Sequence, residues 1–299
     1  MPQTAVADSG TGISLKEFAA RHGLHSAAAL PSLPAYLREI WAYRHFIRAY
    51  SGARITSTFG QTRLGTIWQV LTPILNAAVY YVIFGVLLNT KGGDVSNFIA
   101  YLCTGVFLFG FTQVVVSGGI NSVHANLGLI RALHFPRAAL PISIVAIELR
   151  NMVASMSVLI IIVLATGEPI TLEWLFVLPI LLCLSLFNCG LALFGARLGS
   201  KLTDIRQLVP FFIRVWMYGS AVLYPVQRFT DHLHGWKLAL VEANPMLVYI
   251  ELMRHSLMEN VKLASPPTQL WIEAIAWATV MFSVGFIYFW RGEKGYGRG

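Results

Sequence analysis

The strongest constraint on this chain is a set of long apolar runs that contain few charges. A helix needs about 20 residues to cross the hydrocarbon core of a bilayer. Five runs reach that length: 66–89, 97–119, 141–166, 173–196 and 268–290. A sixth run, 207–225, is shorter and contains Arg214. Only 12% of the residues are charged, about half of the fraction in a soluble domain, so most of the surface has to face lipid. We therefore expect an all-α integral membrane protein with six transmembrane helices.

The charges outside these runs predict an orientation. Of the 22 Lys and Arg residues, 15 fall on the side of the two termini and 5 fall on the opposite side, where the long loop 226–267 lies. Positive charge concentrates on the cytosolic side of membrane proteins, so both termini are expected in the cytosol. In a soluble protein the net charge of +8 would suggest nucleic acid as a partner, but in a membrane protein the sidedness of the charges matters more. Residues 1–35 lack the apolar core of a signal peptide and predict a flexible cytosolic leader.

The segment from Tyr36 to about residue 60 predicts an amphipathic helix ahead of the first span. Its apolar positions recur at helical spacing on one face: Tyr36, Ile40, Tyr43, Ile47 and Tyr50. Arg38, Arg44 and Arg48 gather towards the other face, and Trp41 belongs to the same element. A helix with a basic face and an aromatic face suits the headgroup plane of a bilayer. The alternative is a helix that packs on its own protein.

The loop 226–267 predicts two short helices. Residues 244–261 place one apolar stripe and one polar stripe on a helix: Met246, Ile250, Met253, Leu257 and Val261 against Glu251, His255 and Glu259. Residues 231–245 form a shorter piece that ends at Pro245. These helices are expected to be re-entrant or interfacial, or to cap a pathway, and a plain external lid is the alternative.

Motifs for covalent chemistry are missing from the sequence. The nearest approach to a phosphate-binding loop, GARLGSKLT from Gly195, is one residue short and lies at the end of a predicted span. None of the eight histidines lies in a span, and none has co-ligands at metal-binding spacing. The three cysteines lie inside apolar runs and form no disulfide framework. We therefore expect a chain that is not an enzyme and holds no metal or cofactor.

Three charges are expected to be buried within the predicted spans: Glu148, Arg150 and Arg214. An ionisable group in a bilayer costs a few kcal/mol, so it has a functional role by default. A bridge between Glu148 and Arg214 is one interpretation. The other is that Arg150 or Arg214 meets an anionic group of a substrate, such as a pyrophosphate, that enters from the cytosol.

Several segments occur in a fixed order along the chain. A basic amphipathic helix runs into LGTIWQVLTPILNAAVYYVIFG (64–85), and FPRAALP (135–141) precedes the third span. KLTDIRQLVPFF (201–212) and AVLYP (221–225) frame the fifth span, and NPM (244–246) and Arg254 follow. From about residue 36 the chain thus resembles the membrane subunit of ABC-2 type transporters, in the branch that exports polysaccharides. It departs from the family in reading Thr-Asp-Ile-Arg before the fifth span, where Arg-Asp is frequent, and Ser220-Ala221-Val222 where Ser-Pro-Val is frequent.

The resemblance implies a permease that works in the bacterial inner membrane with a separate ATPase. Two copies of the chain would form a homodimer around one channel, and two ATPase subunits, which carry ATP and Mg, would dock beneath it. The loop 120–140 would be the main docking element. Its expected contact residues are Leu127, Ile130, Arg131, His134, Phe135 and Arg137. Without the resemblance, this loop is only a long cytosolic connection.

The cargo implied by the resemblance is a lipid-linked polysaccharide of the O-antigen, galactan or teichoic-acid class, and the actinobacterial galactan exporters are the most similar. Aromatic residues of the first two spans are candidates to line the pathway, together with the three charges: Trp68, Tyr80, Phe84, Phe107 and Phe111. Aromatic faces stack on sugar rings, although helix packing explains the same residues. An ABC-2 exporter of a small drug or lipid is the nearest alternative, and a membrane-embedded transferase is a more distant one.

Overall fold

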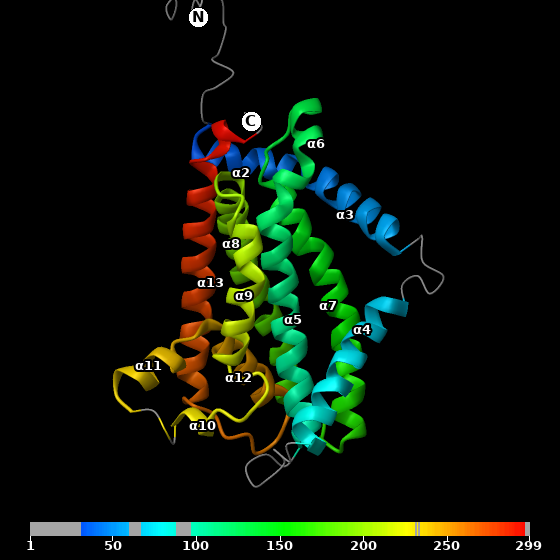
Figure 1. The fold of residues 1–299 in the computed structure, drawn as a ribbon, viewed down its shortest axis with the longest axis vertical. Helices are drawn as coiled ribbons and strands as arrows, with labels where there is room; N and C mark the ends of the chain where they lie inside the picture. The colour runs from blue at the N-terminus through cyan, green and yellow to red at the C-terminus, as the bar shows by residue number, and fades with distance from the viewer. Residues whose placement is uncertain (1–30, 60–66, 88–96, 231, 233, 297–299) are drawn as a thin grey trace, which may run out of the picture.

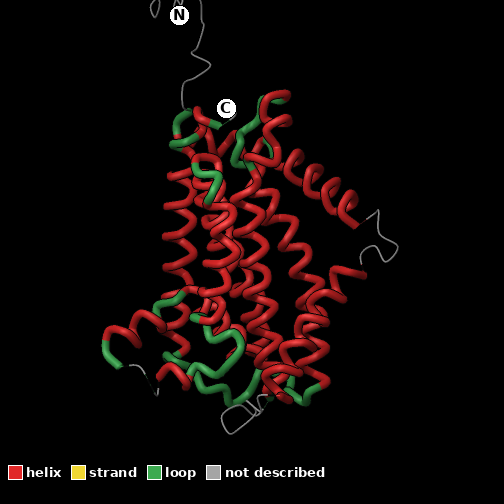
Figure 2. Tube along the Cα trace, in the orientation of Figure 1, coloured by secondary structure: helices red, strands yellow, loops and turns green. Residues whose placement is uncertain are grey.

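The computed structural model is helical throughout the residues that it describes, which are 31–59, 67–87, 97–230, 232 and 234–296, and these contain no strand (Figures 1 and 2). The longer helices are α2 (Leu33–Ala42), α3 (Arg44–Phe59), α4 (Ile67–Tyr80), α5 (Phe98–Ser122), α7 (Ala139–Ala165), α8 (Val177–Lys201), α9 (Ile205–Tyr218), α12 (Pro245–Leu257) and α13 (Pro267–Trp290). The shorter pieces are the π-helix Tyr81–Leu87, the 3-10 helices His124–Asn126, Leu172–Phe176 and Glu293–Gly295, and α6 (Leu127–Ala132), α10 (Gln227–Thr230) and α11 (Trp236–Glu242). Most of the predicted leader, residues 1–30, lies outside the described residues.

Within the described residues, four helices are long and apolar enough to cross a membrane: α5, α7, α8 with the 3-10 turn before it, and α13. Their 24–30 residues correspond to about 36–45 Å of helix, more than the ~30 Å of a hydrocarbon core. They confirm the predicted spans at 97–119, 141–166, 173–196 and 268–290. The predicted first span coincides with α4 and the π-helix that continues it, and Pro73 lies inside α4.

The central helices α5, α8 and α13 approach one another closely because glycines lie at their contacts. A Cβ atom on Gly285 of α13 would overlap the carbonyl oxygen of Gly190 on α8. A Cβ atom on Gly119 of α5 would lie 2.7 Å from the Cα atom of Ala192. Small residues let helix backbones pack at short range where lipid supplies no hydrophobic drive between helices. This tight set forms the frame on which the other helices lie.

The predicted span at 207–225 differs from the structure. Helix α9 ends at Tyr218, seven residues before the predicted end, and the chain then turns over residues 219–224. Its 14 residues make about 21 Å of helix, which is shorter than the hydrocarbon core. The turn is stable because α12 supplies hydrogen-bond partners for it, as described below, and this partner is remote in the sequence.

The two ends of the bundle carry different elements (Figure 1). Helices α2 and α6 lie at the same end as the C-terminus of α13, and α10, α11 and α12 lie at the opposite end. Helix α12 is no external lid, because 11 of its 13 residues are buried against the bundle. The described starting and closing helices therefore meet at one end, as the predicted orientation requires.

Candidate functional site

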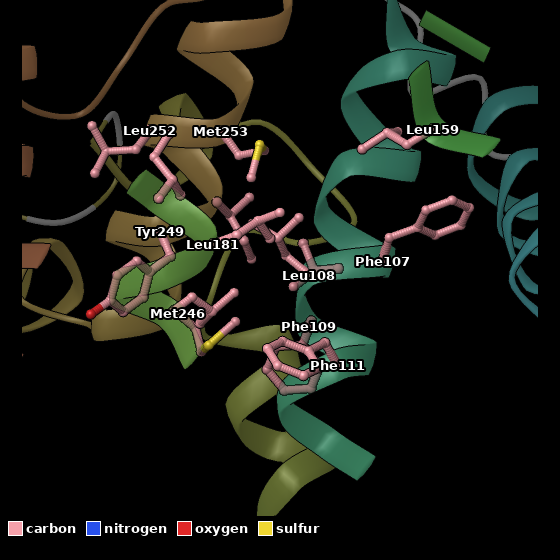
Figure 3. Close-up of a cluster of buried hydrophobic side chains, with 14 of the residues drawn as sticks. Phe107, Leu108, Phe109, Phe111, Leu159, Leu181, Met246, Tyr249, Leu252 and Met253 are labelled. Carbon is pink, nitrogen blue, oxygen red and sulfur yellow. The ribbon is translucent and has the colours of Figure 1, made fainter. Parts of the chain in front are cut away.

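A cavity of about 290 Å³ lies between α4, α5 and α7. Its aromatic wall consists of Trp68 from α4 with Phe107 and Phe111 from α5. Figure 3 shows Phe107 on the side of α5 that points away from Met246 and Tyr249 of α12. Helix α5 thus separates the densely packed side chains around α12 from the cavity on its other side.

The wall of the cavity formed by α7 is polar. The side-chain amide of Asn151 donates a hydrogen bond of 3.0 Å to Oε2 of Glu148, and both residues line the cavity with Ser155. The side-chain oxygen of Asn151 is buried and accepts no hydrogen bond in the described part of the chain. Glu148 and Asn151 stand one helical turn apart, so that they share a face of α7. The cavity therefore combines aromatic surface with hydrogen-bond acceptors inside the membrane region.

Four of the eight predicted pathway residues meet in this cavity: Trp68, Phe107, Phe111 and Glu148. Arg150 and Arg214 do not line it, and both are exposed on α7 and α9 of the single chain, so that their contact with an anionic substrate group stays a prediction. The alternative bridge between Glu148 and Arg214 is not formed among the described residues, where Glu148 pairs with Asn151. The side chains of Tyr80 and Phe84 lie outside the described residues.

The charge that the structure buries most completely is Arg254 of α12, which the sequence analysis counted among the loop residues. Its guanidinium has no exposed surface and lies 3.3 Å from the centre of the Tyr101 ring. It donates hydrogen bonds of 3.0–3.2 Å to the carbonyl oxygens of Tyr101, Ala221 and Val222. Arg254 therefore fastens the turn after α9 to α5.

Asn244, the N-cap residue directly before α12, holds the start of the same turn. Asn244 donates to the carbonyl oxygen of Gly219 at 2.9 Å, and its side-chain oxygen accepts from the indole of Trp216 at 2.9 Å. The same oxygen caps α12 by accepting from the amide of Met246. The sequence contained a signal for the burial of α12. On a helix built from residues 246–258, apolar side chains occur on every face, and a helix with this pattern is buried.

Glu251, next to Arg254 on α12, is buried at 2% exposure. Both of its carboxylate oxygens accept from the amide of Ala264, at 3.0 and 3.2 Å. Burial raises the pKa of Glu251 to about 7, against the lowering effects of the Ala264 hydrogen bond and of the Arg254 charge. This carboxyl group therefore titrates near neutral pH.

The opposite end of the bundle carries the predicted docking loop. Helix α6 presents Arg131 at its exposed side, and Leu133 and His134 beyond it are exposed as well. Leu127 is half-buried, and Ile130 is buried inside the chain at 7% exposure. The residues predicted to contact the ATPase thus form two groups. Those of the first group are exposed at the surface, and those of the second pack the loop against the rest of the chain.

Phe135 and Arg137, also predicted for docking, belong to the second group. The ring of Phe135 lies 5.0 Å from that of Phe46 on α3. The amide of Arg137 donates to Oε1 of Glu293 at 3.0 Å, and its guanidinium donates to the carbonyl oxygen of Glu293. The hydroxyl of Tyr36 donates to the other oxygen of Glu293 at 2.7 Å. One carboxylate thereby joins α2, the docking loop and the segment after α13, and its burial raises its pKa above the ordinary value.

The same contacts describe the predicted interfacial helix, which the structure divides into α2 and α3 at Tyr43. Tyr36 is buried at 1% exposure against the chain itself, as in the alternative interpretation. Arg38 and Arg48 are exposed, and Trp41 is 71% exposed with the guanidinium of Arg44 at 5.6 Å from its ring. The tyrosine face therefore packs on the protein, while Trp41 and the basic residues stay at the surface.

Residues 47–258 match the model of the family described as ABC-2 type transporter. The chain belongs to this family. The match covers α4 to α12, and so it includes the cavity, α6 and Arg254, while Tyr36 and Glu293 lie outside it. As a member of a family of transport permeases, the chain is a multi-pass membrane protein rather than an enzyme.

Individual relatives of this ABC-2 transporter are similar at modest identity. The O-antigen export system permease protein RfbA of Myxococcus xanthus is 25% identical over 213 residues, which are 71% of this chain and 79% of that protein. A protein of the same name from Klebsiella pneumoniae is 25% identical over 198 residues, 66% of this chain and 74% of that protein. The polysialic acid transport protein KpsM of Escherichia coli is 23% identical over 205 residues, 68% of this chain and 78% of that protein.

Proposed function

We propose that this chain is the permease of an exporter that moves a polysaccharide from the cytosol across the bacterial inner membrane. The observation that carries this proposal is the similarity over about two thirds of the chain to permeases named for O-antigen export and polysialic acid transport. The cargo is a lipid-linked sugar chain of the O-antigen, galactan or teichoic-acid class. ATP is hydrolysed, with Mg, on a separate ATPase subunit.

The working assembly in this proposal contains two permease chains and two ATPase subunits. Six crossings per chain follow if α4 with its π-helix and α9 cross together with the four longer helices, and both termini then lie in the cytosol. Phe211 and Phe212 of α9 are exposed by 64% and 62%, which suits a face covered by the second copy. Arg214 is exposed on the same helix, and a channel between the two copies would keep this charge away from lipid.

The ATPase docks at the end where α2, α6 and the C-terminus meet. Arg131, Leu133 and His134 supply the exposed contacts, and the contacts of Arg137 with Glu293 connect α6 to α2 and α13. A displacement of α6 by the ATPase is thereby transmitted to α2 and α13. At the opposite end, Arg254 and Asn244 hold the turn after α9, where the pathway opens to the outside.

A purification of this chain from its own host in mild detergent tests the proposal. We expect a soluble ABC ATPase in an equimolar amount, together with loss of sugar-polymer export when the gene is silenced. Recovery of the intact permease without any ATPase, under conditions that retain the ATPase on a known permease, would refute the proposed function. Protease accessibility of tags on both termini from the cytosolic side alone tests the orientation in the same cells.

A further inference from the structure

We infer that the cavity between α4, α5 and α7 binds one uncharged, hydroxyl-rich sugar ring. The ring lies against the aromatic wall and donates hydroxyl hydrogens to Glu148 and Asn151. This inference rests on the proposed function, because it assigns the ring to the exported chain. It names a site within a single copy of the protein and a chemical class of ligand for that site.

The polar groups on the cavity wall are hydrogen-bond acceptors, so a ligand that donates hydrogen bonds suits them. Glu148 receives one hydrogen bond, from Asn151, although a carboxylate has about four acceptor positions. The side-chain oxygen of Asn151 is buried without a partner in the described structure. Buried polar atoms in native proteins are paired with few exceptions, by protein or by water, so this oxygen on the cavity wall can accept a hydrogen bond from a ligand hydroxyl that replaces water. Hydroxyl groups can donate to both residues.

The charges around the cavity exclude a phosphate as the preferred ligand. Phosphate is bound by Arg, Lys or converging amide hydrogens, whereas none of the described residues that line this cavity is basic. Arg150, the nearest basic residue in the sequence to Asn151, is exposed on the outside of α7. A phosphate group would also stand beside the Glu148 carboxylate, which disfavours it. The site therefore suits the sugar portion of a lipid-linked chain and not its anionic linkage.

The polar wall of the cavity disfavours a lipid tail. An acyl chain would cover the Glu148 carboxylate and the Asn151 oxygen without donating a hydrogen bond to either, which is unfavourable. The cavity volume of about 290 Å³ lies just below the range of small-molecule sites, roughly 300–1,000 Å³, as suits a ligand group of one ring. Flat aromatic surface combined with a few polar groups is the usual lining of such a site. A single ring flanked by Trp68 and Phe107 fits these dimensions.

The test uses the purified full chain in lipid nanodiscs free of glycoside detergent. The probes are octyl glucoside, octyl galactoside and octyl mannoside below their micelle concentrations, with octyl phosphate as the charged counterpart. We expect a saturable change in tryptophan fluorescence with at least one glycoside, its loss in Trp68→Phe, and no saturable change with octyl phosphate. Absence of saturable binding for all three glycosides, or equal binding of octyl phosphate, would overturn the inference without any variant.

The variants test the polar wall. Glu148→Ala and Asn151→Ala should each weaken glycoside binding at least about 10-fold, the effect of losing a hydrogen bond with a charged or buried partner. Glu148→Gln keeps the shape and an acceptor oxygen, so it should weaken binding by a smaller factor. Glu173→Gln, which changes an exposed carboxylate on the 3-10 helix before α8, is the matched control and should bind as the parent does. Parental affinity in both alanine variants contradicts the site.

Export assays separate this inference from the proposed function. If the parent chain co-purifies with an ATPase and exports a sugar polymer, while both alanine variants bind and export like the parent, the cavity assignment fails and the proposed function stands. If no ATPase accompanies the chain and no polymer is exported, the proposed function fails. Glycoside binding in the cavity would then belong to a different activity.

Discussion

Replacement of the buried Arg254 tests how the turn after α9 is held. Its guanidinium supplies hydrogen bonds to three buried carbonyl groups and stacks on the Tyr101 ring. A buried acceptor that loses its donor costs about 1–3 kcal/mol, so three carbonyl groups amount to about 3–9 kcal/mol. The removed charge offsets several kcal/mol of this loss, because burying it was itself unfavourable. We therefore expect Arg254→Met to destabilise the protein by about 2–4 kcal/mol.

Arg254→Lys separates the geometry of the group from its charge. An ammonium group keeps the cost of burying a charge, but it has no planar fork that reaches three separate carbonyl groups. The lysine variant should therefore be at least as destabilised as the methionine variant, although it is the more conservative change. Thermal unfolding in one detergent is the measurement, with midpoint shifts of several degrees expected for a chain of this size. Arg150→Lys, at an exposed position of α7, is the matched control and should stay within about 0.5 kcal/mol of the parent.

A third variant, on α5, changes the surroundings of the Arg254 guanidinium. A Cβ atom on Gly105 would lie 2.8 Å from Nη2 of Arg254 and 2.8 Å from the carbonyl oxygen of Val222. Gly105→Ala should therefore displace the guanidinium and destabilise the protein, although alanine favours a helix more than glycine does. If Arg254→Lys unfolds at the parental temperature and Gly105→Ala is stabilised, the guanidinium does not hold the turn and the reasoning is refuted.

Three further predictions concern other parts of the molecule. Gly285→Ala should lower the unfolding temperature, because its Cβ atom would meet the backbone of α8. Gly52→Ala, with open space around it, is the control and should be neutral or slightly stabilising. Equal thermal unfolding midpoints for the two variants would contradict the close packing of α8 and α13. Because the pKa of Glu251 is raised, the native state keeps a proton between pH 4.5 and about 7 that the unfolded chain loses, so the unfolding free energy should fall by up to about 3 kcal/mol as the pH rises through this window. Glu251→Gln should remove this contribution and make pH-dependent melting curves less steep, while the raised pKa of Glu293 leaves a slope of the same sign. Leu133→Asp should reduce ATPase recovery in a pull-down at least about 10-fold, whereas Leu172→Asp, exposed on the 3-10 helix that contacts α12, should leave it unchanged. Full recovery with Leu133→Asp would count against docking at the end that carries α6.

The sequence predicted those parts of the fold that depend on local composition. Four spans follow from apolar runs long enough to cross a bilayer, and the structure has four helices at those places. Trp68, Phe107, Phe111 and Glu148 were selected for their residue type within spans, and they meet in one cavity. These residues converge because of the way α4, α5 and α7 pack, which the sequence does not show. The residue types therefore identified some members of the site, but they did not predict which other residues line it or what it binds.

The errors of the sequence analysis share a physical cause, which is pairing between distant segments. The end of α9 at Tyr218 depends on Asn244 and Arg254, and nothing within 207–225 indicates these partners. Arg254 was counted with the external loop 226–267, yet its guanidinium is buried and donates to backbone carbonyl groups from two other segments.

The carboxylate of Glu293 has a consequence for how the protein is made. Glu293 accepts a hydrogen bond from Tyr36, which lies 257 positions earlier in the chain, and another from Arg137, which lies between the two in sequence. A ribosome that adds about 5–20 residues per second needs roughly 10–50 s to make the stretch from Tyr36 to Glu293. During that interval α2 and the loop after α6 have only their direct contacts, such as the hydrogen bond from the amide of Ala138 to the Tyr36 hydroxyl, and lack the carboxylate that joins both to the segment after α13. The surface that includes α2 and α6 is therefore completed only when synthesis has passed the last membrane helix, so a chain truncated before Glu293 would present it without this contact.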